Sequence, residues 1–168
     1  IDTDQLQKAT VALLLETINA IKQALEIKDT GKRLICVDGK EQKGTGRMYD
    51  SDSKVRNLQT LHIYDASNEI CLFSRAIEEK TNEIPVAQEL LRSMNLKDCI
   101  VTFDALHTQK ETIAIIRSRK GDYIGGLKGN QTGLLEEASA YFSEPDLLQH
   151  YKEKGDYYKE TEKAHNRI

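Results

Sequence analysis

The chain has 168 residues, of which 39% are hydrophobic and 30% charged, and its formal net charge is −3 at pH 7. This length suits one domain with a single core. No apolar run approaches the ~20 residues that a membrane span needs, so a soluble globular protein without a membrane partner is expected. The small negative charge gives no overall attraction to nucleic acid, although basic residues can still cluster locally.

The first third of the chain is predicted to form a helix and then a buried strand. Apolar residues recur every three or four positions in residues 4–26, the pattern of an amphipathic helix, and Asp2 is placed to cap it. The continuous apolar run at residues 34–37 is typical of a strand buried on both faces. Residues 41–57 carry glycines, serines and charges without periodicity, which predicts a mobile surface loop long enough to be functional.

The rest of the chain is predicted to alternate strands with helices. Further strands are expected at residues 58–65, 70–76, 99–103 and 123–127. Helices are expected after a cap at Thr81 and Asn82, after a capping box of Thr108 with Glu111, over the apolar residues 134–142, and from Pro145 onward. This order predicts an α/β fold with a mixed five-stranded sheet (β-β-β-α-β-α-β-α) flanked by helices, behind an N-terminal amphipathic helix.

Two of these strands carry an aspartate at or near the C-terminal end. Asp38 follows the run LICV and precedes Gly39, and Asp104 follows CIVTF. If the two strands are neighbours in the sheet, the carboxylates meet, and such a pair suits hard cations such as Mg2+ or Mn2+. Ions held in this way serve phosphodiester cleavage in many enzymes. The alternative is structural: Asp38 begins a turn with Gly39, and Asp104 caps or precedes a helix.

Five segments of the chain resemble, in order, the DDE transposases of the ISAs-type insertion sequences, which include the H-repeat-associated proteins. They are VDGK at 37–40, EKTNEIP at 79–85, VTFDALHTQKE at 101–111, GDYIGGLKGNQ at 121–131 and AHNRI at 164–168. The resemblance implies an RNase H-like catalytic core at residues 32–168, behind an N-terminal helix and linker at residues 1–31. It also implies an acidic triad that binds two divalent ions, with Asp38 and Asp104 as the first two acids, and that hydrolyses and joins DNA strands at transposon ends.

The sequence departs from the family pattern near the expected third acid. Family members usually read HGRIE, whereas this chain reads HNRI, with Asn166 in place of glycine, and ends at Ile168. The third carboxylate is therefore expected just beyond Ile168, so the chain as given is expected to be truncated and inactive alone. Glu160 and Glu162 lie nearby, but a solvated charged stretch is the simpler interpretation. Lys43 stands where the family commonly has arginine, which replaces a bidentate phosphate contact by a point charge.

Basic and polar residues are the candidates for contact with DNA phosphates. They are Lys40, Lys43, Arg47, Lys128, Asn130, His165 and Arg167. The alternative for Lys40, Lys43 and Arg47 is an ordinary charged loop, and for the Lys128–Asn130 loop a turn and helix cap. His165 and Arg167 are expected to be disordered. His107 is a candidate to hold a phosphate or a nearby carboxylate, whereas His62 is expected in a core or strand-edge role. The resemblance implies DNA partners (transposon ends and target), a homo-oligomer in the DNA complex, and a bacterial cytoplasmic protein associated with the nucleoid.

Three functions compete on these observations. The first is the catalytic-core segment of a DNA transposase, with metal-dependent phosphodiester hydrolysis and strand transfer. The second is a catalytically inactive transposase remnant with at most weak DNA binding, a hypothesis motivated by the missing third acid and the net charge of −3. The third is a stand-alone nuclease on the same fold, which would cleave DNA that lacks terminal repeats.

Overall fold

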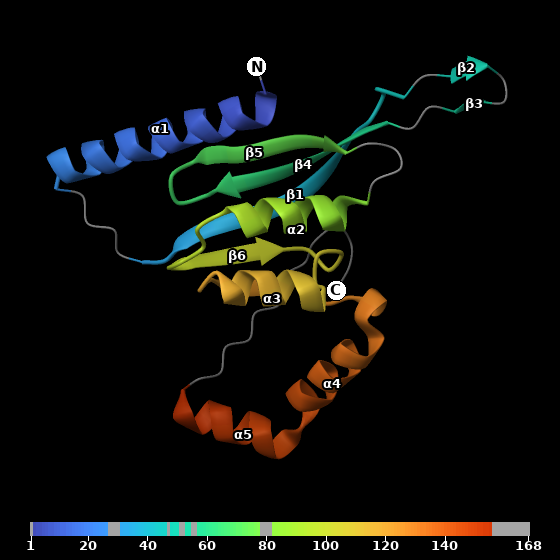
Figure 1. The fold of residues 1–168 in the computed structure, drawn as a ribbon. Helices are drawn as coiled ribbons and strands as arrows, with labels where there is room; N and C mark the ends of the chain where they lie inside the picture. Colours follow the sequence, from blue (N-terminus) through green and yellow to red (C-terminus); the bar gives the residue numbers. More distant parts are fainter. Residues whose placement is uncertain are drawn as a thin grey trace. The chain divides into compact units, whose positions relative to one another are not determined.

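The structure, a computed structural model, describes residues 2–26, 31–46, 48–50, 53–54, 57–77 and 82–155. The chain divides into two compact units, Ile1–Gly126 and Leu127–Ile168. The first unit contains the sheet and the helices α1 to α3, and the second contains the helices α4 and α5 (Figure 1). His165 and Arg167, together with Glu160, Glu162 and Arg47, lie outside the described residues.

A five-stranded mixed sheet forms the centre of the first unit, with its strands in the order β5-β4-β1-β6-β7. The strands are β1 Arg33–Gln42, β4 Leu58–Asp65, β5 Ile70–Ile77, β6 Cys99–Phe103 and β7 Asp122–Gly125. β4 runs antiparallel to β1 and β5, whereas β6 runs parallel to β1 and β7. This order and these directions are the RNase H-like arrangement, so the predicted fold class is confirmed.

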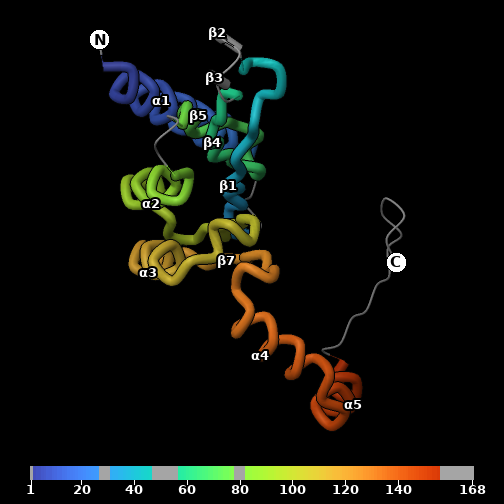
Figure 2. The backbone as a smooth tube through the Cα atoms, turned by 90° about the vertical axis from the view of Figure 1, so that its right-hand side faces the viewer, coloured from blue at the N-terminus to red at the C-terminus, as the bar shows by residue number. Residues whose placement is uncertain are grey.

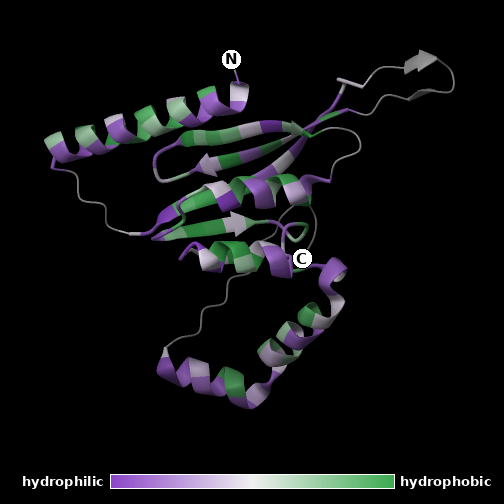
Figure 3. Ribbon diagram, viewed as in Figure 1, coloured by the Kyte–Doolittle hydropathy of each residue, from purple (hydrophilic) through white to green (hydrophobic). Residues whose placement is uncertain are grey.

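The hydrophobic core lies between the sheet and two helices, α2 Glu83–Ser93 and α3 Lys110–Ser118. The two helices lie side by side in both Figure 1 and Figure 2. Successive residues of a strand point to opposite faces, and in β6 the alternate residues Cys99, Val101 and Phe103 are buried. Figure 3 shows β6 coloured mainly as hydrophobic, and Leu61 and Ile63 are the core residues of β4.

The predicted N-terminal helix is confirmed as α1, Thr3–Ala24. Asp2 caps it, because the Asp2 side chain accepts a hydrogen bond from the backbone N–H of Asp4. Val11 and Leu15 pack against the core, whereas several other leucines of α1 are exposed. The helix therefore buries only a narrow stripe of the apolar face that its sequence predicts.

The segment between β1 and β4 is more regular than its composition predicts. β1 continues to Gln42, and two short strands, β2 Met48–Asp50 and β3 Ser53–Lys54, pair antiparallel in a separate sheet. The expectation of a mobile surface loop over residues 41–57 is wrong where the chain forms these strands. β1 and β4 stay paired up to Gln42 opposite Leu58, and pairing with a neighbouring strand outweighs the low strand propensity of glycine and charged residues.

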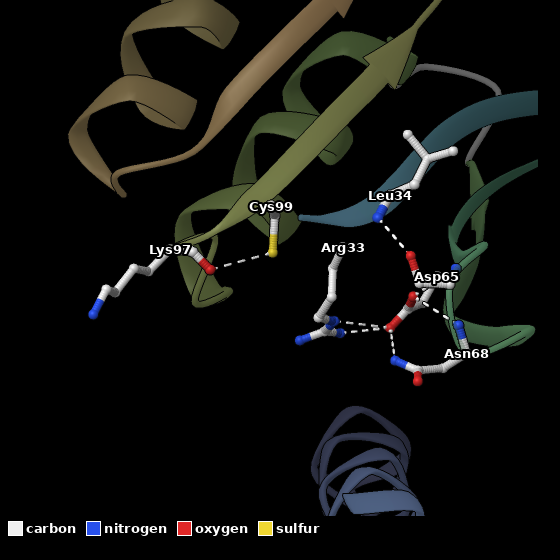
Figure 4. Close-up of polar contacts among 7 residues, drawn as sticks. Arg33, Leu34, Asp65, Asn68, Lys97 and Cys99 are labelled. Carbon is white, nitrogen blue, oxygen red and sulfur yellow. Dashed lines mark hydrogen bonds and ion pairs between the residues drawn. The ribbon is translucent and has the colours of Figure 1, made fainter. Parts of the chain in front are cut away.

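Hydrogen bonds of a buried aspartate connect the turn between β4 and β5 to the start of β1 (Figure 4). Asp65 is 0% exposed, and its Oδ2 accepts hydrogen bonds from Arg33 Nη2 at 2.6 Å and from Asn68 Nδ2 at 2.7 Å. Its Oδ1 accepts from the backbone N–H groups of Ser67 and Asn68. A buried carboxylate is tolerated only with such partners, so this cluster sets how the β4–β5 hairpin meets β1.

A surface cluster joins β7 to the residue before β1, and it predicts a pH dependence of stability. Asp122 pairs with Lys32 and Arg117, and the Lys32 ammonium is the main cause that lowers the pKa of the Asp122 carboxyl. A carboxyl with a lowered folded-state pKa stabilises the fold above its unfolded pKa, and this contribution is lost as the pH falls through the folded value.

We expect the urea midpoint of the wild-type protein to fall more than that of Asp122→Asn when the pH is lowered from about 6 to about 2. The difference is expected to be small, because the Asp122 carboxylate is exposed to solvent. Urea unfolding followed by circular dichroism at several pH values measures it. Equal decreases in both proteins would contradict a stabilising role of the ionised carboxylate.

The described part of the second unit contains a short 3-10 helix, η1 Gly129–Gln131, followed by α4 Thr132–Ser143 and α5 Pro145–Lys154. Pro145 occupies the first turn of α5, as its sequence predicts. The hydroxyl groups of Tyr141 and Tyr151 lie 2.6 Å apart and connect the two helices. Among the described residues of the whole chain, no helix combines the length and the hydropathy that a membrane span requires.

Candidate active site

Two exposed aspartates lie at corresponding positions of neighbouring strands. β1 and β6 are adjacent and parallel, and their last paired residues are Val37 and Phe103. Asp38 follows Val37 within β1, Asp104 directly follows Phe103 at the end of β6, and both are exposed. Because β1 pairs with β6, the expectation that these two acids come from neighbouring strands is confirmed. Neighbouring strands are about 4.8 Å apart.

Asp38 does not begin a turn, so this structural alternative is wrong. It lies inside β1, opposite the half-buried His62 of β4, and Gly39 pairs with Leu61 in the same ladder. The expectation that Asp38 stands at the strand end holds only for the pairing with β6, which stops at Val37. β1 is longer than its apolar run because β4 continues to pair with it.

Asp104 closes a tight turn between β6 and α3. Its Oδ1 accepts hydrogen bonds from the backbone N–H groups of Leu106, at 2.9 Å, and His107, at 3.4 Å. The Thr108 hydroxyl donates to the backbone oxygens of Asp104 and Gly126. The predicted capping box at Thr108 is therefore wrong: α3 begins at Lys110, and the Thr108 side chain is used to hold this turn.

The donor chemistry of the two aspartates suits a hard divalent cation. Carboxylate oxygens are preferred ligands of Mg2+ and Mn2+, and Asp104 uses one oxygen for the turn while a carboxylate offers about four acceptor positions. Within the described ranges, no group of three or more His, Cys, Asp or Glu residues is arranged to hold a metal. The described residues thus provide two candidate ligands, Asp38 and Asp104.

A buried polar pair lies next to these aspartates. His107 Nε2 lies 2.7 Å from Glu83 Oε1, and the side chains of His107 and Glu83 are 1% and 18% exposed. The expectation that His107 holds a nearby carboxylate is confirmed. Its burial removes it from direct contact with a phosphate. Sequence reasoning missed Glu83, although the segment EKTNEIP contains it.

The structure places some of the predicted DNA-binding residues. Lys40 lies on β1, two residues after Asp38 and therefore on the same face of the strand, and Lys43 directly follows β1. Both lysines are exposed. Lys128 and Asn130 belong to the second unit, at the start of η1, and are also exposed.

Comparison with known proteins shows which family the chain is similar to. Residues 29–167 match the family model described as a transposase DDE domain. The chain is 30% identical over 138 residues to the putative transposase YncI of Escherichia coli (strain K12), covering 82% of this chain and 53% of the relative. It is also 30% identical over 137 residues to the H repeat-associated putative transposase YbfD of the same organism, covering 81% and 51%.

The chain spans between about a third and about half of the length of the curated relatives that it matches. Among solved structures, it is similar to the cryo-EM structure of a piggyBac transposase synaptic complex with hairpin DNA. The TM-score is 0.47 and the identity 15%, over 86% of this chain and 33% of that chain.

Proposed function

We propose that this chain, which belongs to the family of transposase DDE domains, forms part of the catalytic core of an ISAs-type DNA transposase. In this proposal residues 32–168 belong to the core, behind an N-terminal helix and linker at residues 1–31. The reaction is hydrolysis and transfer of DNA strands at the ends of an insertion sequence. The observation that supports it is that Asp38 and Asp104 each directly follow the last paired residues, Val37 and Phe103, of the adjacent parallel strands β1 and β6.

Asp38 and Asp104 would hold the divalent cation, Mg2+ or Mn2+. When bound, the cation supplies Lewis-acid assistance to phosphodiester cleavage. The protein contributes by orienting the ligands. The backbone N–H groups of Leu106 and His107 fix one oxygen of Asp104 before any ion arrives, and the pairing of β1 with β4 holds Asp38 opposite His62. Such preorganisation lowers the cost of assembling the site.

DNA is the proposed substrate and partner. Lys40 and Lys43 are exposed near Asp38, where ammonium groups can neutralise backbone phosphates. We extend the proposed contact surface to Arg47, Lys128, Asn130, His165 and Arg167. Transposition joins paired ends, so a homo-oligomer in the DNA complex and an association with the bacterial nucleoid in the cytoplasm are part of the same proposal.

The test is cleavage of a duplex that carries the insertion-sequence end by the full-length protein. Cleavage is expected with Mg2+ or Mn2+ and is expected to stop when EDTA removes the ion, because hydrolysis of phosphodiesters by such sites depends on the metal. Gel analysis of end-labelled DNA measures it. Cleavage that persists in EDTA would contradict the proposal. DNA binding without cleavage would favour the inactive transposase, and cleavage that ignores the end sequence would favour a nuclease.

A further inference from the structure

We propose that Glu83 and His107 are positioning residues, which hold Asp104 in register with Asp38. This inference rests on the proposed function of the two aspartates as metal ligands. Glu83 and His107 themselves are not proposed to touch the metal or the DNA.

The Glu83–His107 pair connects two segments that are separated in the chain. Glu83 is the first residue of α2, and His107 lies in the turn between β6 and α3. Their 2.7 Å contact is almost completely shielded on the His107 side. A buried polar side chain costs free energy unless it is hydrogen-bonded, and hydrogen bonds to carboxylates are among the strong ones. The pair therefore ties the β6–α3 turn to the start of α2.

The turn that carries His107 also sets the position of Asp104. The backbone N–H of His107 is one of the two donors to Asp104 Oδ1, and the other is that of the neighbouring Leu106. On the other side of the turn, the Thr108 hydroxyl donates to Gly126 O at 2.7 Å. Loss of the contact between the His107 ring and Glu83 would remove one of the contacts that hold this turn in place. A displacement of about 1 Å at a catalytic group can lower a rate about 10²-fold.

Glu83 of this pair also packs against β1, at Gly39. A Cβ atom at Gly39 would lie 2.0 Å from Glu83 Oε1 and 2.4 Å from Glu83 Oε2, so the carboxylate occupies the space of a side chain at this position. Gly39 directly follows Asp38, and successive strand residues point to opposite faces. Glu83 therefore supports β1 from the face opposite to the Asp38 side chain. The pair touches the strand of one aspartate and the turn of the other.

The primary experiment measures Mn2+ binding by the full-length protein, from the electron paramagnetic resonance signal of free Mn2+. His107→Ala is expected to weaken Mn2+ binding about 10-fold or more, the range for removal of partners that orient metal ligands. Glu83→Ala is expected to do the same. Glu83→Gln keeps an oxygen that accepts from His107 Nε2, so it is expected to recover most of the affinity that Glu83→Ala loses. The Mn2+ affinities are compared between variants of equal stability, because a contact that only stabilises the fold would not change the affinity under that condition.

Gly39→Ala tests the geometry without changing either partner. Its methyl group is expected to displace the Glu83 carboxylate and to weaken Mn2+ binding as Glu83→Ala does. In the Glu83→Ala background, Gly39→Ala is expected to cause little further loss, because the group that it displaces is already absent. Additive losses would show that the methyl group acts on Asp38 directly and would contradict the inference.

Glu89→Ala is the matched control, since Glu89 lies on the same helix and has an exposed carboxylate that pairs with Arg75. It is expected to leave Mn2+ binding unchanged. If His107→Ala and Glu83→Ala remain folded by circular dichroism but bind Mn2+ as the wild type does, the inference is overturned. If His107→Ala does not fold, Glu83→Ala and Gly39→Ala decide the question.

A metal-independent measurement separates this inference from the proposed function. Hydrogen exchange, followed by mass spectrometry without metal, is expected to be at least several-fold faster in peptides covering residues 104–109 of His107→Ala than in the wild type, and unchanged in β6. If the wild type binds no Mn2+, the proposed function fails, while faster exchange still supports the positioning role. Unchanged exchange in the turn would overturn that role, whatever the result with Mn2+.

Discussion

Replacing Asp104 by asparagine is expected to lower metal-dependent strand cleavage by more than about 10²-fold, beyond the loss for a residue that only orients a ligand. Asparagine keeps an oxygen that can accept from the N–H groups of Leu106 and His107, so the turn is expected to survive. The negative charge that attracts the cation is lost. Asp38→Asn is expected to have a similar effect, because it removes the other carboxylate. Cleavage of labelled end DNA, with stability checked by thermal unfolding, measures both variants.

Asp98→Asn is the matched control for these two variants. Asp98 precedes the other end of β6, is exposed, and has a left-handed backbone with φ of 58°, which asparagine tolerates. The substitution removes one carboxylate without touching the candidate site, so wild-type cleavage is expected. If Asp38→Asn and Asp104→Asn also cleave at the wild-type rate, the assignment of the two aspartates as metal ligands is wrong.

The largest effect on stability is expected at Asp65. Asp65→Ala removes a completely buried acceptor and leaves Arg33 and the turn donors of Ser67 and Asn68 without it. The free energy of unfolding is expected to fall by about 3 kcal/mol, the lower part of the range for breaking a buried ion pair, because Arg33 is partly exposed. Urea unfolding at neutral pH measures this change.

Asp4→Ala is the control for the Asp65 experiment, since Asp4 also pairs with an arginine, Arg75, but about half of its side chain is exposed. The free energy of unfolding of Asp4→Ala is expected to fall by less than about 1 kcal/mol, as for surface ion pairs. Equal effects of Asp4→Ala and Asp65→Ala would show that the burial of Asp65 does not make its interactions stronger.

Local sequence patterns were sufficient for most of the secondary structure. The strand predicted at residues 99–103 is β6, and the hairpin at residues 58–65 and 70–76 differs from β4 and β5 by one residue. These segments are apolar runs bounded by turn residues, which is information contained within a few positions. The predictions failed where a distant partner decides, as for the extension of β1 along β4 and for Thr108, whose hydroxyl binds Gly126.

The candidate site shows the same division. Residue types and the ends of apolar runs were sufficient to predict the two acids and the type of cation that they suit. Their adjacency depends on the parallel pairing of β1 with β6, and the contact of Glu83 with Gly39 and His107 depends on how α2 packs on the sheet. Strand register and side-chain burial arise from contacts between segments far apart in the chain, and no local pattern encodes them.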